Sequence, residues 1–117
     1  MNDLPATAYK VLTDEQMAAL LAVGSLAGAP VDLADGYIHL STAEQLAGTL
    51  DKHFADQSGL HIAAVDLIAL AAVVRWEPSR GGQLFPHIYA ALPYSAVIAH
   101  GPLLRNAAGG ILLPDAR

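Results

Sequence analysis

The chain has 117 residues, a length typical of one domain, and 54% of them are hydrophobic while only 15% are charged. This composition excludes a disordered chain, and the formal net charge of −5 argues against binding to nucleic acid or to anionic membranes, which both require a basic surface. The absence of cysteine excludes disulfides, thiolate catalysis and cysteine-ligated metals.

We expect one cytoplasmic domain over residues 1–117, with a core at about 8–100 and an irregular tail at 101–117. The first residues lack the basic and apolar regions of a signal peptide. The longest apolar stretch, residues 60–74, is shorter than the ~18 residues that a membrane span requires.

The first half of the chain predicts two strands, each followed by a capped helix. Residues 8–12 form the first strand, and Thr13 with Gln16 matches a capping box for a helix that ends at Gly24. Residues 25–35 predict a loop, with Gly28, Pro30 and Asp35-Gly36 as breakers.

The second strand is expected at residues 37–41, and the sequence from Ser41 to Glu44 resembles another capping box. The helix that it opens continues through Leu46, Leu50 and Phe54.

The second half predicts mainly strands, which together with the early helices indicates an α+β fold. The expected strands are residues 60–65, 73–77, 84–89 and 96–100, with Asp66 capping a helical turn at 67–71 and a flexible loop at 78–82. Pro86 has no N–H to donate, so we expect strand 84–89 to lie at a sheet edge or to carry a bulge.

The strand at residues 37–41 is the first candidate site. Alternation places Tyr37, His39 and Ser41 on one face, where they suit a polar cleft, with aliphatic residues on the other. The helix that begins at Ser41 or Thr42 could receive a phosphate at its N-terminus. Alternatively, His39 is a buried structural histidine and Ser41 only a cap.

The second candidate site combines Arg75, Glu77 and Arg80 with a Gly-Gly loop. Glu77 at a strand end could act as a general base or bind a ribose hydroxyl. Arg80 could hold a phosphate through two parallel hydrogen bonds. The alternative is an Arg75–Glu77 surface pair of little energetic value, beside a loop that only turns the chain.

The third candidate site is the alternation of Phe85, His87 and Tyr89, which forms either core or an aromatic platform. A buried His87 would need a polar partner. We expect no metal, because His39, His87 and Glu77 do not show metal-binding spacing. No GxSxG motif surrounds Ser41, which excludes a serine hydrolase of that class.

Three motifs, at residues 35–42, 76–77 and 85–89, together resemble the bacterial domain-of-unknown-function family 952. The resemblance covers roughly residues 8–99. It implies a fold similar to ADP-ribosyltransferases and RNA 2′-phosphotransferases, in which two small, mostly antiparallel sheets and two or three short helices enclose a cleft for NAD.

By this resemblance, we expect NAD-dependent ADP-ribosyl transfer to a small molecule or protein, with NAD as substrate and no metal. The catalytic residues would be His39, Ser41 and Glu77. The residues that bind the cofactor would be Tyr37, Thr42, Arg75, Arg80, His87 and Tyr89. A non-catalytic module for a nucleotide or metabolite, and a structural or interaction domain without ligand, remain as alternatives. Both a monomer and a homodimer fit the sequence.

Overall fold

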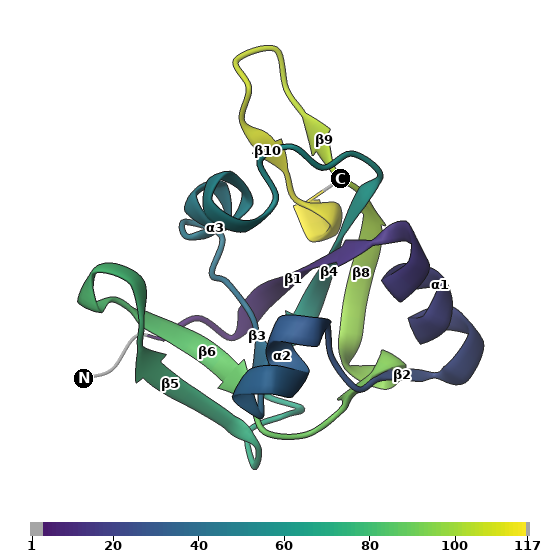
Figure 1. Ribbon diagram of the computed structural model, residues 1–117, viewed down its shortest axis with the longest axis vertical. Coiled ribbons are helices and arrows are strands. Elements are labelled where there is room, and N and C mark those ends of the chain that lie inside the picture. The colour runs from purple at the N-terminus through teal and green to yellow at the C-terminus, as the bar shows by residue number, and fades with distance from the viewer. Residues whose placement is uncertain (1–3, 117) are drawn as a thin grey trace.

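The structure, a computed structural model, describes residues 4–116, which form an α+β fold of small antiparallel sheets and three helices (Figure 1). One three-stranded sheet has the order β1 (Thr7–Thr13), β4 (Leu60–Asp66), β8 (Val97–Pro102). The other has the order β3 (Ile38–His39), β6 (Leu84–Ile88), β5 (Val74–Pro78). Two short pairs join β2 (Ser25–Leu26) to β7 (Leu92–Pro93), and β9 (Leu104–Arg105) to β10 (Ile111–Leu112).

The helices are α1 (Asp14–Val23), α2 (Pro30–Asp35) and α3 (Leu46–His53), and the 3-10 turns are Arg80–Gly82, Tyr94–Ala96 and Pro114–Ala116. Helix α1 is the longest of the described helices, with 10 residues. Within residues 4–116, no helix is long and apolar enough to cross a membrane.

In the β1-β4-β8 sheet, β1 and β4 are buried on both faces, and each face belongs to a separate hydrophobic cluster. On β1, Ala8 and Leu12 pack in the cluster that includes α1, whereas Tyr9 and Val11 pack in the cluster that includes α3. Lys10 therefore lies on the face of Ala8 and Leu12, since side chains alternate along a strand. This charged residue is only 5% exposed.

The prediction for the first strand and helix is confirmed. Thr13 accepts a hydrogen bond from the Gln16 backbone, and the Gln16 side chain accepts one from Thr13 N, which completes the capping box. Gly24 ends the helix at φ 88°, a left-handed conformation that glycine adopts at little cost.

The loop predicted at residues 25–35 is wrong, because this segment contains β2 and α2. Pro30 occupies the start of a helix, where its missing N–H costs no hydrogen bond. The Asp32 carboxylate accepts a hydrogen bond from Ala29 N (2.7 Å) and so caps the helix from within, and Gly36 ends it. The residues that indicated a loop are the stop and start signals of this short helix.

The strand predicted at residues 37–41 is shorter in the structure, and the capping box predicted from Ser41 to Glu44 lies one residue later. The ladder covers only Ile38–His39, and the Ser41 backbone instead exchanges hydrogen bonds with Tyr9 of β1 (2.7 and 2.9 Å). Since Ser41 is held by that bridge, the reciprocal capping bonds form between Thr42 and Gln45. Helix α3 consequently begins at Leu46.

The predicted edge position of Pro86 is wrong, because β6 is the central strand of its sheet. Pro86 pairs with Trp76 on β5, and its carbonyl accepts from Leu40 N (3.1 Å) on the other side. Pro86 has no N–H to donate in return to Leu40, so the β3 ladder ends at His39. The helical turn expected at residues 67–71 is wrong, because this segment is a turn without helix. Asp66 nevertheless accepts hydrogen bonds from Ile68 N and Ala69 N.

The tail from residue 101 contains the end of β8, the β9–β10 hairpin and the turn Pro114–Ala116. This turn is tied to the sheet, since Tyr9 donates its hydroxyl to the Asp115 carboxylate (3.1 Å). Burial and the charge of Asp115 raise the pKa of Tyr9 to about 12.

We expect this phenol to make the fold sensitive to alkali. The pKa of an unfolded tyrosine is about 10, so the unfolded chain loses its proton first and stability falls as pH rises from about 10 to 12. The change Asp115→Asn should lower the pKa of Tyr9. Ultraviolet titration of the tyrosines, with Tyr9→Phe to assign the signal, measures this, and a wild-type Tyr9 that titrates near 10 would contradict it.

Candidate functional site

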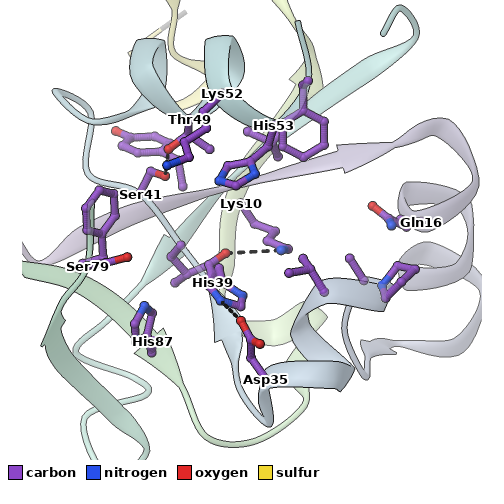
Figure 2. A pocket seen from close by; sticks show the side chains of 18 of the residues that line it. Lys10, Gln16, Asp35, His39, Ser41, Thr49, Lys52, His53, Ser79 and His87 are labelled. Carbon is purple, nitrogen blue, oxygen red and sulfur yellow. Dashed lines mark hydrogen bonds and ion pairs between the residues drawn. The ribbon is translucent and has the colours of Figure 1, made fainter. Parts of the chain in front are cut away.

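A cleft of about 690 Å³ lies between the two three-stranded sheets, and α2 and α3 contribute to its rim. This volume is in the range of small-molecule sites. Its polar lining includes side chains from β1, α2, β3 and α3 (Figure 2). The labelled residues among them are Lys10, Gln16, Asp35, His39, Ser41, Thr49, Lys52, His53, Ser79 and His87.

Asp32 is a buried carboxylate that organises one wall of the cleft. It is 1% exposed and accepts hydrogen bonds from Lys10 Nζ (2.8 Å) and from the backbone N–H groups of Ala29 (2.7 Å) and His39 (3.1 Å). Burial alone would raise the pKa of Asp32, but the hydrogen bond from His39 and the charge of Lys10 hold it well below its usual range. Asp32 is therefore ionised, and its charge is compensated within the fold.

His39 is held between two carboxylates at the edge of the cleft. Its Nδ1 lies 2.6 Å from Asp32 Oδ1, and its Nε2 lies 2.9 Å from Asp35 Oδ2. Ionised carboxylates only accept hydrogen bonds, so this arrangement suits a ring that donates from both nitrogens. Asp32 is buried, with its side chain 1% exposed, whereas the side chain of Asp35 is 46% exposed. A ligand can therefore replace Asp35 at Nε2 while Asp32 keeps the ring in place.

His87 lines the cleft (Figure 2), and a hydrogen bond to Glu77 holds its ring in place. Its Nδ1 is 2.7 Å from Glu77 Oε1, which also accepts the Tyr89 hydroxyl at 2.7 Å. The hydrogen bonds from His87 and Tyr89 lower the pKa of Glu77. Glu77 thus acts on the cleft through His87, and it is absent from the lining.

Tyr37 connects the two histidines in an aromatic array. Its ring stacks on His87 with a centroid distance of 4.2 Å and lies 4.7 Å from His39 and 5.1 Å from Tyr89. The His39 and His87 rings are 5.3 Å apart in an edge-on arrangement. His87 is 3% exposed, so it supports Tyr37 from one side, and one end of the cleft offers the rings of Tyr37 and His39 within the reach of one small molecule.

The structure brings together part of the predicted site. The predicted residues that line the cleft are Tyr37, His39, Ser41 and His87. Glu77 and Tyr89 contact it through His87 and Tyr37, and the Arg75 guanidinium lies 5.1 Å from the Tyr89 ring centroid. The side chain of Arg80 lies outside the described part of the structure.

Ser41 and Thr42 are engaged in holding α3 in place. The Ser41 hydroxyl is 2.7 Å from the Thr49 hydroxyl, and Ser41 is 4% exposed. Thr42 caps the turn before α3 with Gln45, whose side chain also donates to Leu84 O (2.8 Å). The cleft is lined by later turns of α3, so a phosphate site at the N-terminus of this helix is not supported.

Sequence reasoning missed the charged residues that surround His39. Asp32 and Asp35 come from the segment predicted as a loop, and Lys52 and His53 come from the last turn of α3. Lys10 did carry a signal, because a lysine within a buried apolar strand requires a buried acidic partner. Its partner could not be identified from spacing, since Asp32 lies 22 residues away.

The sequence matches the family described as protein of unknown function (DUF952) over residues 11–100. A crystal structure of protein CC0527 from Caulobacter crescentus is similar, with a TM-score of 0.82, 41% sequence identity, and coverage of 92% of this chain and 94% of that chain. The solution NMR structure of CC0527 gives a TM-score of 0.76 at 40% identity, covering 92% of this chain and 91% of that chain. Among curated proteins, none matches this sequence.

Proposed function

The chain belongs to the DUF952 family of proteins of unknown function, and we propose that its cleft binds NAD and transfers the ADP-ribosyl group to a small molecule or protein. The observation that carries the proposal is the array of Tyr37, His39 and His87 at one end of a 690 Å³ cleft. The proposal includes a fold related to that of ADP-ribosyltransferases, with two small sheets that enclose the substrate.

The array suits the nicotinamide riboside end of NAD. A nicotinamide ring can pack against the aromatic surface around Tyr37, while His39 donates a hydrogen bond to a ribose hydroxyl. Asp32 fixes the orientation of the His39 ring, and Glu77 fixes that of His87. Held in this way, the glycosidic bond is presented in one orientation, which lowers the entropic part of the barrier.

In the proposed reaction, the bond between ribose C1′ and the nicotinamide nitrogen breaks, and the bonding electrons leave with nicotinamide. The positive charge that develops on the ribose needs a nearby carboxylate. We assign this role to Asp35, because it lines the cleft, whereas both hydrogen bonds of Glu77 Oε1 are directed to His87 and Tyr89. The acceptor nucleophile then bonds to C1′ and loses its proton.

Isothermal titration with NAD and an assay for released nicotinamide test this function. We expect heat of binding at or below millimolar NAD, a rise in melting temperature with NAD concentration, and nicotinamide release once an acceptor is present. A folded sample that gives neither heat nor a thermal shift at millimolar NAD would contradict the proposal.

A second function, non-catalytic binding of a nucleotide, is favoured by one observation. Ser41, expected to assist catalysis, is 4% exposed and its hydroxyl is bonded to Thr49, so it offers little to a substrate. In that case NAD or another nucleotide binds tightly, and no nicotinamide is released under any acceptor condition. The same titration and release assay separates the two functions.

A further inference from the structure

We propose that Lys52 and His53, in the last turn of α3, form a diphosphate subsite in the cleft, which selects a nucleoside diphosphate ester over a nucleoside without phosphate. This inference rests on the proposed function for the rest of the ligand. The subsite would hold the diphosphate of the ligand, whereas the aromatic end of the cleft would hold its nicotinamide riboside.

The distribution of positive charge in the chain supports an anion site at the last turn of α3. The sequence has six Lys and Arg residues and a net charge of −5, so a cation in a cleft is uncommon in this chain. Among the described Lys and Arg side chains, Lys10 and Lys52 line the cleft. The charge of Lys10 is compensated by Asp32 at 2.8 Å, so Lys10 contributes little net attraction for an anion.

Lys52 differs from Lys10 in its surroundings. It is exposed, and within residues 4–116 it forms no ion pair. A solvated ammonium group of this kind is available to a phosphate at the cost of only modest desolvation. The helix dipole also favours a cation near the C-terminus of α3. This effect would be the same if Lys52 faced away from the cleft, so it does not explain why Lys52 lines the cleft.

Lys52 and His53 lie on the same face of α3. Thr49 precedes Lys52 by three residues and His53 by four, so all three lie on one side of the helix. This side lines the cleft, and Figure 2 shows Lys52 and His53 above the space whose opposite edge holds His39 and Asp35. His53 thus lines the cleft next to Lys52.

The size of the cleft is consistent with a ligand of two parts. A volume of about 690 Å³ is well above the lower limit of ligand sites, about 300 Å³. A nicotinamide riboside held against Tyr37 and His39 would leave room toward α3. A diphosphate in this room would face Lys52 and His53, and the ammonium group of Lys52 would offset part of its charge.

The test compares the wild type with Lys52→Ala by calorimetry, using NAD, ADP and nicotinamide riboside as probes. We expect Lys52→Ala to weaken NAD and ADP roughly ten- to hundred-fold, as for loss of one charge-assisted hydrogen bond, and not to weaken nicotinamide riboside, a cation without phosphate. Arg105→Ala is the matched control, because it removes one exposed positive charge from β9, outside the cleft lining, and should change none of the affinities. Melting temperatures confirm that each variant is folded.

The results separate this subsite from the proposed function. If the wild type binds ADP through Lys52 but gives no heat with NAD, the subsite stands and the NAD proposal fails. The subsite is overturned if Lys52→Ala binds NAD and ADP as the wild type does, or if the wild type binds neither. Equal weakening of nicotinamide riboside, or of all probes by Arg105→Ala, would also overturn it, because the effect would not be specific to phosphate or to this rim.

Discussion

Replacing Asp32 with alanine is expected to lower the free energy of unfolding by about 3–5 kcal/mol and the melting temperature by roughly 10–20 °C. The carboxylate is 1% exposed and compensates Lys10, which is 5% exposed. Its removal leaves a buried ammonium group without its counter-charge and leaves Ala29 N and His39 without acceptors. Thermal and urea denaturation measure the effect.

Asp35→Ala is the matched control for this prediction. Asp35 bonds the same histidine as Asp32, but it is 46% exposed, so its loss should change the melting temperature by only a few degrees. The double change Lys10→Met with Asp32→Leu should recover much of the lost stability, because it removes both buried charges. An Asp32→Ala protein that melts close to the wild type would show that the buried pair does not stabilise the fold.

The pKa of Asp32 also predicts a pH dependence with a definite sign. Because this pKa is lower in the folded protein than in the unfolded chain, the carboxylate stabilises the fold fully above the unfolded value of about 4. As pH falls below that value, the unfolded chain takes up the proton first and stability decreases, by up to about 1.4 kcal/mol per pH unit. In Asp32→Asn this acid-dependent loss should be smaller.

Replacing His39 with alanine is expected to reduce the rate of nicotinamide release on the order of 100-fold or more, if the cleft transfers ADP-ribose as proposed. The variant loses the donor that orients the ribose, and Asp35 loses its partner at Nε2. The same variant should weaken NAD binding in calorimetry. A rate equal to that of the wild type would remove His39 from the proposed mechanism.

His100→Ala serves as the control for His39→Ala. His100 lies on β8, near Tyr94, and is outside the cleft lining. Its replacement should therefore leave both binding and nicotinamide release unchanged. Since His39 also donates to the buried Asp32, the melting temperature of His39→Ala must be measured, and rates compared only where the variant is folded.

Local features of the fold could be predicted because neighbouring residues determine them. The Thr13–Gln16 capping box and the glycine stop of α1 depend on backbone groups within a few residues, and both are observed. Alternation along residues 37–41 likewise placed Tyr37, His39 and Ser41 on one face, and all three line the cleft. The sequence motifs also indicated the DUF952 family, which the match over residues 11–100 confirms.

The sequence by itself thus determined the α+β class, the boundaries of α1 and the face that carries His39, since each follows from local hydrogen bonds or strand alternation. Only the tertiary structure decided which charged residues surround His39: Asp32, predicted to lie in a loop, is their buried centre. Its bonds to Lys10 and His39 span 22 and 7 residues, and no local pattern specifies such pairs. The same holds for Pro86, whose central position depends on the pairing of β6 with both β3 and β5, and whose missing N–H leaves β3 only two residues long.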